Sequence, residues 1–367
     1  MSNVTHDSWM IYGAYGFTGR LIVEEALRRG HRPVLAGRDA EQLRSMAKPL
    51  ELEIMPLSLD DAPSLGMAAR SSSLIVNAAG PFSETGPKII DACLKTSTPY
   101  VDISGEFHHL RAVEALDEQA REAGIPLLTG GGFGVTFGDC LARHVVDRLP
   151  DATSLLISVA ANNAQSTPAV RRTILDVIAK GGYAVEGGSW VKRPLAHQLW
   201  TVRDGSTDTP FAAAPMGELA AARTSTSVAN IVVGRPMPAK TAKRLRMVSP
   251  LLQGALSIAP LRRALGRDRG KPQIPTPEPK EGWRSQLWAE ARNARGDRAV
   301  ARLETGEGYA FTARAALANI EALFTRKLAG AFTPARAFGA EHVLTIPGVR
   351  LIDLDPESFS PLERVHA

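Results

Sequence analysis

The fold is decided by one stretch near the start of the chain, Met10-Ile11-Tyr12-Gly13-Ala14-Tyr15-Gly16-Phe17-Thr18-Gly19-Arg20. Its apolar opening, its three evenly spaced glycines and the amphipathic run that follows predict a strand, a tight turn and a helix. Gly13 would permit the sharp turn, Gly16 would let a pyrophosphate approach the backbone, and Gly19 would let the helix pack closely on the strand. The N–H groups and the dipole at the start of that helix favour a bound diphosphate.

The residues after this helix give the glycine turn its context. A second apolar run, 33–37, completes a strand–turn–helix–strand succession within about thirty residues, the size of a βαβ unit. A glycine-rich loop that binds nothing is the alternative, but it would not need the flanking strands and helix. The pattern therefore predicts a dinucleotide-binding site that includes Gly13, Tyr15, Gly16, Phe17, Thr18 and Gly19.

The end of the second predicted strand indicates which dinucleotide binds. Sites that prefer NAD(H) usually carry Asp or Glu there to bind the ribose 2′-hydroxyl, whereas here Arg38 follows Gly37. A guanidinium can bind a 2′-phosphate through two parallel hydrogen bonds, so Arg38 predicts NADP(H). Asp39 lies one residue later, where it can instead cap the helix expected from Ala40.

The composition is that of a globular protein with room for two domains: 367 residues, of which 44% are hydrophobic. The net charge of +5 suits an anionic cofactor or substrate and does not by itself indicate nucleic acid. Two isolated cysteines, Cys93 and Cys140, predict reduced and buried thiols. We find no signal-peptide pattern and no apolar run long enough to cross a membrane, and we expect a soluble, cytoplasmic protein.

Strand and helix patterns alternate to about residue 150 and predict further ligand contacts where strands end. A strand over 52–59 ends at Asp60, which would lie near the adenine unless it caps the next helix. Further strands are expected over 73–79, 99–106 and 125–128, with helices over 86–95, 110–123 and 138–148. The cofactor contacts expected in this part of the chain are Asp60, Ala79, Gly80, Pro81, Phe82, Gly132 and Phe133.

These patterns predict an α/β protein with a Rossmann-type, doubly wound parallel sheet over residues 1–150. Beyond it, strands expected at 152–161, 285–291 and 298–303 have few helices between them. This favours a second α+β domain over 151–330, built on a mixed or antiparallel sheet. Helices are expected over 167–179 and 309–327, and the segment 331–367 is expected to return to the first domain.

A basic, proline-rich segment lies at 234–279, where many Lys and Arg residues accompany few acids. Its middle, 248–265, is apolar, and its end, 272–279, is too rich in proline for regular structure. Two interpretations stay open. The segment is a mobile lid or a docking surface for an acidic carrier protein or a membrane, or it is a solvated helix and linker.

Four blocks of sequence together carry a resemblance to a known family: Tyr12 to Arg20; Asn77 to Phe82 with Tyr100 to Glu106; Gly131 to Phe133 with Asp139; and Gly306 to Tyr309, Thr312-Ala313 and Gly330 to Gly339. The chain resembles the saccharopine-dehydrogenase-like NADP-binding oxidoreductases, and among them most of all the trans-acting enoyl reductases. The resemblance implies a Rossmann-type fold, NADP(H) and hydride transfer. The chain departs from the family at 134–137 and 162–167, positions that should lie near the nicotinamide and the substrate.

Hydride transfer also needs a proton source, and the sequence offers several. We find neither a Ser-Tyr-x-x-x-Lys arrangement nor a cluster of metal ligands. The candidate catalytic residues are therefore Asp102 and Glu106, together with Tyr100, His108 and His109. Each has a structural alternative: Asp102 can accept hydrogen bonds from backbone amides, Glu106 can cap a helix, and the two histidines can lie at the surface. Water can also supply the proton.

The leading hypothesis is an NADPH-dependent reductase that transfers hydride to a polarised C=C bond of a biosynthetic intermediate. Reduction of a C=N bond, as in saccharopine formation, is the alternative, and a non-catalytic NADP(H)-binding scaffold protein is a further one. The expected partner is a small-molecule substrate, which a biosynthetic carrier could present, and the chain could form a homodimer. Nucleic acid is not expected, because the basic residues lack interleaved aromatic side chains on which bases could stack.

Replacement of Arg38 with alanine tests the cofactor assignment. If Arg38 binds the 2′-phosphate, Arg38→Ala should weaken NADPH binding by about 1.5–3 kcal/mol, roughly ten- to a hundredfold in Kd. NADH lacks this phosphate and should bind almost as it does to the unaltered protein. Fluorescence titration with both nucleotides measures the difference, and an equal loss for both would refute the assignment.

Overall fold

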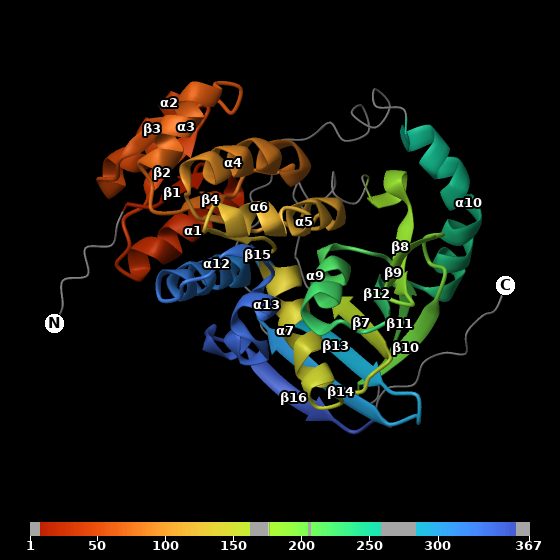
Figure 1. Cartoon of the computed structure of the whole chain (residues 1–367). Helices are drawn as coiled ribbons and strands as arrows, with labels where there is room; N and C mark the ends of the chain where they lie inside the picture. Colours follow the sequence, from red (N-terminus) through yellow and green to blue (C-terminus); the bar gives the residue numbers. More distant parts are fainter. Residues whose placement is uncertain (1–7, 162–174, 176, 205–206, 258–283, 357–367) are drawn as a thin grey trace. The chain divides into compact units, whose positions relative to one another are not determined.

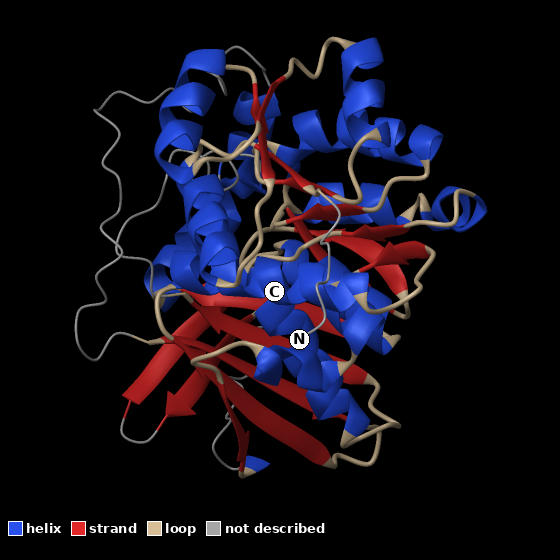
Figure 2. Ribbon diagram, turned by 90° about the vertical axis from the view of Figure 1, so that its left-hand side faces the viewer, coloured by secondary structure: helices blue, strands red, loops and turns tan. Residues whose placement is uncertain are grey.

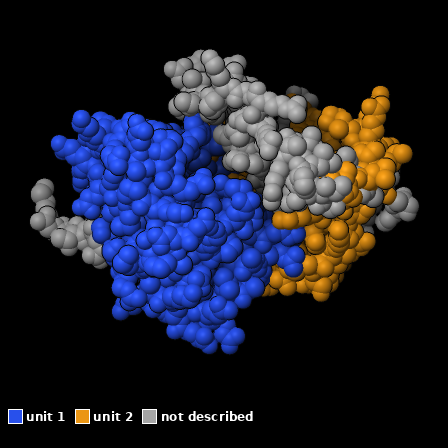
Figure 3. Space-filling view, turned by 90° about the horizontal axis from the view of Figure 1, so that it is seen from above, with its two compact units in different colours: residues 1–133, 309–338 blue, residues 134–308, 339–367 orange. Residues whose placement is uncertain are grey.

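The computed structural model describes residues 8–161, 175, 177–204, 207–257 and 284–356. The chain forms two compact units, which Figure 3 colours separately. Unit 1 comprises Met1–Phe133 and Tyr309–Phe338, and unit 2 comprises Gly134–Gly308 and Gly339–Ala367. The chain thus passes from one unit to the other three times.

Unit 1 is built on a seven-stranded sheet in which all strand pairs are parallel. Its strands are β1 (Met10–Tyr12), β2 (Val34–Gly37), β3 (Ile54–Pro56), β4 (Ile75–Asn77), β5 (Tyr100–Asp102), β6 (Pro126–Leu128) and β15 (Gly330–Phe332). The order across the sheet is β15-β6-β5-β4-β1-β2-β3. The chain starts in β1, winds outward to β3 and then returns to β4 on the other side of β1. This is the doubly wound topology expected from the sequence, and the fold class is confirmed.

Helices cover both faces of this sheet (Figure 2). They are α1 (Phe17–Arg28), α2 (Ala40–Ala47), α3 (Ala62–Arg70), α4 (Phe82–Thr96), α5 (Phe107–Glu114), α6 (Asp117–Glu122), α12 (Gly308–Phe324) and the short α13 (Pro334–Phe338), with a 3-10 turn, η1 (Lys48–Leu50), after α2. Side chains of β1 alternate between two apolar clusters. Ile11 packs with α1, α2 and α12, whereas Met10 and Tyr12 pack with α3 and α4. Because both faces are buried, the strands read as continuous apolar runs.

Unit 2 is built on a mixed sheet, in agreement with the sequence-based expectation. Its strands are β7 (Ser154–Ala160), β8 (Gly182–Glu186), β9 (Ser189–Arg193), β10 (Leu199–Asp204), β11 (Thr207–Ala213), β12 (Asn230–Pro236), β13 (Ser285–Arg292), β14 (Arg298–Thr305) and β16 (Arg350–Leu354). The pair β7–β12 is parallel, and the other pairs are antiparallel. The helices of this unit whose bounds the structure describes are α7 (Phe133–Asp147), α9 (Gly217–Thr226), α10 (Ala239–Ser257) and a 3-10 turn, η2 (Ala340–Thr345).

Two helices of unit 2 differ from the expectation. Helix α7 begins at Phe133 rather than near residue 138 because its early glycines serve packing: a Cβ atom on Gly138 would lie 2.9 Å from Cγ of Glu218 in α9. Helix α9 was not expected, because it is buried on most sides and its sequence lacks a one-sided apolar period. The helix expected over 167–179 lies mostly outside the described residues.

The C-terminal segment contributes to both sheets. Strand β15 pairs in parallel with β6 in unit 1, as a returning segment should, but β16 pairs antiparallel with β14 in unit 2. The expectation that the whole of 331–367 returns to the first domain is therefore wrong for β16, where backbone pairing with β14 is available instead.

In the basic segment, 234–236 belong to β12 and 239–257 form α10, while 258–283 lie outside the described residues. Within the described ranges, no helix combines the length and the apolar character needed to cross a membrane.

Because α1 packs so closely on β1, we expect one added methyl group at Gly19 to lower the free energy of unfolding. A Cβ atom on Gly19 would overlap the carbonyl oxygen of Gly13 and lie 2.8 Å from that of Ala14, and backbone atoms cannot move aside cheaply. We expect Gly19→Ala to lower the free energy of unfolding by about 1–3 kcal/mol in urea denaturation. Gly66 is the matched control, because it also lies in a helix but faces open space. Gly66→Ala should raise stability by about 0.5–1 kcal/mol. Equal effects would contradict the close packing.

Candidate functional site

The turn between β1 and α1 has the geometry expected of a diphosphate cradle. Gly13 has a φ of +88°, a left-handed conformation that side chains other than glycine rarely adopt. A Cβ atom there would lie 2.9 Å from Cβ of Ala79, so a larger residue would also collide with the end of β4. The N–H of Gly16 donates to the carbonyl oxygen of Gly13 at 3.0 Å and closes the turn.

The amides at the start of α1 are available, unlike those of the next three helices. No side chain caps α1. By contrast, Asp39 caps α2, Asp61 caps α3, and the Glu106 carboxylate accepts from the first amides of α4. In this described part of unit 1, α1 therefore retains the N–H groups and the dipole that can bind an external anion.

Arg38 lies exposed directly after β2, on the rim of the same turn. It makes no hydrogen bond or ion pair with residues that the structure describes, so its guanidinium is available for an external phosphate. The neighbouring Tyr15 ring packs against Gly37, where a Cβ atom would lie 2.5 Å from a ring carbon. Asp39 accepts from the amides of Glu41 and Gln42 at 3.0 Å, and the hydrogen bonds from Gln42 lower its pKa. Asp39 thus takes the helix-capping role that the sequence allowed.

Asp60 lies near this rim and pairs with Lys88 of α4 at 2.5 Å. Its hydrogen bond and ion pair with Lys88 lower the pKa of Asp60, and the charge of Arg38 contributes further. Arg38 also acts on Tyr12, whose pKa burial raises. Arg38 follows β2 and Asp60 follows β3, so both lie at the carboxyl edge of the parallel sheet. The next residue, Asp61, accepts from the Ser64 amide and caps α3.

The loop that joins β4 to α4, residues 78–81, is held by its neighbours. The Ala79 amide donates to Oδ1 of Asn77 at 3.0 Å, and the Thr85 hydroxyl donates to the Ala79 carbonyl at 2.6 Å. The Glu106 carboxylate accepts from the amides of Phe82 and Ser83 at 2.8 and 2.9 Å. The contacts expected at Ala79, Gly80, Pro81 and Phe82 thus lie in one ordered turn, and Glu106 is engaged in holding it.

Asp102, at the end of β5, is the centre of a fully buried hydrogen-bond network. Its carboxylate accepts from the following donors: the Tyr100 hydroxyl at 3.0 Å, the Ser104 amide at 2.9 Å, the Thr129 hydroxyl at 3.0 Å and the Gly130 amide at 3.0 Å, with Nε2 of His109 at 2.6 Å. The network joins the carboxyl ends of β5 and β6 to α5. This arrangement corresponds to the structural alternative that the sequence left open, in which Asp102 satisfies backbone amides.

Each partner of the Asp102–His109 pair favours the ionised form of the other, as the directions of their pKa shifts show. Burial alone would raise the pKa of Asp102, but the charge of His109 and several hydrogen bonds outweigh it and hold that pKa below 3.8. Burial alone would lower the pKa of His109, but the charge of Asp102 raises it above 6.5. The His109 ring packs so closely on α4 that Gly86 leaves no room for a Cβ atom. The alternative that both histidines lie at the surface is therefore wrong for His109, which is 3% exposed.

The glycine cluster after β6 is fixed by α12, which sequence reasoning did not assign to the site. The Phe133 amide donates to the Thr312 hydroxyl at 3.2 Å, and the rings of Phe133 and Phe311 meet edge to face, 5.7 Å apart. Asn319 donates to the Gly131 carbonyl at 3.2 Å. A Cβ atom on Gly132 would lie 2.9 Å from the Ile103 carbonyl oxygen, so glycine is needed there. In the sequence, the motif that pointed to this part of α12 was Thr312-Ala313, within the C-terminal block that resembles the family.

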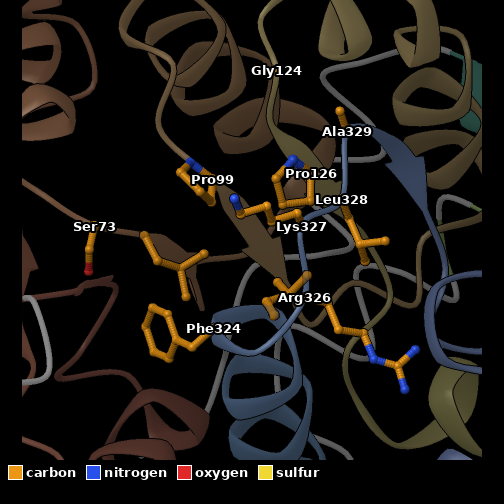
Figure 4. A pocket seen from close by; sticks show the side chains of 11 residues that line it. Ser73, Pro99, Gly124, Pro126, Phe324, Arg326, Lys327, Leu328 and Ala329 are labelled. Atoms are coloured by element: carbon orange, nitrogen blue, oxygen red, sulfur yellow. The ribbon is translucent and has the colours of Figure 1, made fainter. Parts of the chain in front are cut away.

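A cavity of about 380 Å³ lies at the opposite edge of the parallel sheet and is separate from this site (Figure 4). It opens beside the amino ends of β4, β5 and β6, near Ser73, Pro99 and Pro126. Ligands of open α/β sheets bind at the carboxyl ends of the strands, so we do not assign the cofactor to this cavity. The sequence-based substrate positions 162–167 lie outside the described residues.

Comparison with known proteins matches the part of the chain that forms this site. Residues 9–128 match the family model described as "Saccharopine dehydrogenase NADP binding domain". Over residues 9–128, the chain is therefore similar to that family. The fold resemblance extends further: apo saccharopine dehydrogenase (L-Glu forming) from Saccharomyces cerevisiae covers 95% of this chain with a TM-score of 0.62 at 11% identity.

Two relatives matched by sequence each cover about a third of this chain. A probable mitochondrial saccharopine dehydrogenase-like oxidoreductase of Arabidopsis thaliana is 32% identical over 141 residues, which is 34% of this chain and 31% of the relative. A trans-acting enoyl reductase of Mycobacterium tuberculosis is 32% identical over 132 residues, 34% of this chain and 32% of the relative. The match thus spans about a third of the length of these curated relatives.

The charged Asp102–His109 pair predicts how stability depends on pH. The pKa of His109 is raised on folding, so its contribution to the free energy of unfolding is complete below 6.5 and is lost as the pH rises through the raised value. The pKa of Asp102 is lowered, so its contribution is present above 3.8 and is lost as the pH falls through the lowered value. We expect urea unfolding to show falling stability as the pH is raised above 6.5.

Two histidine variants locate the source of this alkaline decrease. His109→Gln should be less stable at neutral pH and should lack the decrease, because no titrating partner of Asp102 remains. His144→Gln removes a more exposed histidine that pairs with Asp353 in unit 2. This variant should still lose stability as the pH is raised above 6.5. A decrease that persists in His109→Gln would contradict the charged pair.

Proposed function

We propose that this protein is an NADPH-dependent reductase that transfers hydride to a polarised C=C bond of a small biosynthetic intermediate. The observation that supports this most directly is the exposed Arg38 at the end of β2, beside the uncapped start of α1. A dinucleotide with a 2′-phosphate matches both features, and the match of residues 9–128 to an NADP-binding domain agrees with it. The proposed substrate could be carried on a biosynthetic enzyme.

The residues present fit such a cofactor. Gly13 and Gly19 let the turn and α1 pack closely against the neighbouring backbone, and the uncapped α1 amides would bind the charge of the diphosphate. Arg38 would hold the 2′-phosphate. The Ala79–Phe82 turn and Gly132–Phe133 would contact the rest of the NADPH molecule. When bound, NADPH supplies the hydride, while the protein positions it and excludes water.

Glu106 and Asp102, the two catalytic candidates from the sequence, are better suited to holding backbone segments in place than to donating a proton. Both Glu106 carboxylate oxygens accept backbone amides of α4, and Asp102 is buried within its own network. We therefore propose that Glu106 fixes the Ala79–Phe82 turn and that Asp102 fixes the ends of β5 and β6. Under this proposal the proton comes from water or from a group outside the described residues.

Two other functions each have an observation in their favour. The family name and the fold of the yeast saccharopine dehydrogenase favour reduction of a C=N bond. The engagement of Asp102 and Glu106 within the protein favours a scaffold that binds NADP(H) without turnover. The matched trans-acting enoyl reductases favour the C=C reductase, because they are oxidoreductases whose names specify that bond.

The decisive assay follows NADPH consumption with a panel of enones and imines, alongside direct NADPH titration. We expect turnover of enones, with little of imines. Glu106→Gln should raise KM for NADPH several-fold, because one of its two hydrogen bonds to the turn is lost, with a smaller change in kcat. A fall of kcat by about 100-fold or more would instead indicate direct proton transfer by Glu106. Tight NADPH binding without turnover of any substrate would support the scaffold, and absence of binding would refute the whole proposal.

A further inference from the structure

The outward face of helix α10 is unusually apolar for a protein surface. Met247 is 79% exposed, Leu251 77% and Val248 42%. On the opposite side of the same helix, Ala242 and Leu256 are buried. Residues 247 and 251 are one helical turn apart, so their side chains stand next to each other on the outward face. Exposed apolar groups that gather in this way indicate an interaction surface.

The charges of α10 are all positive. Lys240, Lys243 and Arg244 are exposed on its first two turns, next to the apolar face. None of these three forms an ion pair or hydrogen bond with residues that the structure describes. The helix from 239 to 257 contains no acid, so nothing on it neutralises these cations.

We propose that the outward face of α10, made of these three cations and of Met247, Val248 and Leu251, docks onto an anionic lipid surface. A helix that lies in the membrane interface combines exposed apolar side chains with Lys and Arg, as this face does. Met247 and Leu251 enter the acyl boundary, while the long stems of Lys240, Lys243 and Arg244 extend to lipid phosphates.

A lipid surface fits this face better than an acidic protein does. The three apolar side chains all belong to one helix, α10, which Figure 1 labels, and the cavity described above is lined by residues of unit 1 alone. A protein partner would need a complementary groove, whereas a bilayer deforms around protruding side chains. Docking of this kind would leave the cofactor site of unit 1 unaltered, so it is independent of the proposed reductase activity.

Site-specific fluorescence tests the proposal on the full chain. Cys93 and Cys140 are buried, and burial raises the pKa of both thiols, so an environment-sensitive thiol probe should label only an introduced cysteine. Met247→Cys places the probe on the α10 face. Met67→Cys is the matched control, because Met67 is 67% exposed but lies on α3 in unit 1.

We expect the probe at position 247 to shift to the blue with phosphatidylcholine–phosphatidylglycerol vesicles and to shift little with phosphatidylcholine alone. The probe at position 67 should not shift with either. Replacement of Lys240, Lys243 and Arg244 with glutamine should weaken binding to the anionic vesicles by about tenfold or more, as should raised salt. Leu251→Cys repeats the measurement if Met247→Cys does not fold, and NADPH affinity checks that each variant is native.

Three outcomes would overturn the proposal. The probe at 247 or 251 does not respond to anionic vesicles, the probe at 67 responds equally, or the triple glutamine variant binds as well as the unaltered protein. An acidic protein partner corresponds to the first of these outcomes. If the unaltered protein binds anionic vesicles but not NADPH, the result counts against the reductase and leaves the docking face intact.

Discussion

The ionised carboxylate of Asp102 is the constraint on which the functional edge of unit 1 depends. It receives donors from β5, from the residues after β6 and from His109 of α5, and it has no contact with solvent. A buried charge is tolerated only when its lone pairs are used, and removing one partner of such a pair typically costs about 3–5 kcal/mol. The network therefore fixes the ends of two strands where the Gly130–Phe133 segment begins.

The same edge shows how a fold can reserve one helix terminus for a ligand. Carboxylates from Asp39, Asp61 and Glu106 accept from the first amides of α2, α3 and α4. The start of α1 receives no side-chain cap, and Gly13 and Gly19 let the turn before it pack closely on the neighbouring backbone. An uncapped terminus leaves its amides for water or an anion, so the chain gives up local stabilisation at the position where a diphosphate would bind.

Unit 2 contains another ion pair with a buried carboxylate, but some of its polar atoms lack hydrogen-bond partners among the described residues. Glu218 of α9, 3% exposed, pairs with Arg235 of β12 at 2.7 Å. Within the described residues, the second carboxylate oxygen of Glu218 and one terminal nitrogen of Arg235 are buried without a hydrogen-bond partner. Glycines 134 and 138 of α7 give this pair its space. Arg235, which the sequence assigned to the basic segment, is thus part of the packing of unit 2.

The sequence by itself determined the βαβ opening, the parallel sheet buried on both faces and the mixed second sheet, and it predicted NADP(H) as the cofactor. These features follow from local rules, because glycine spacing, apolar runs and the residue after β2 act within a few positions of each other. Only the tertiary structure decided the roles of Asp102, Glu106 and His109. Several of their partners lie 7 to 28 residues away along the chain, and whether a carboxylate donates a proton or holds a turn depends on which amides the fold brings to it.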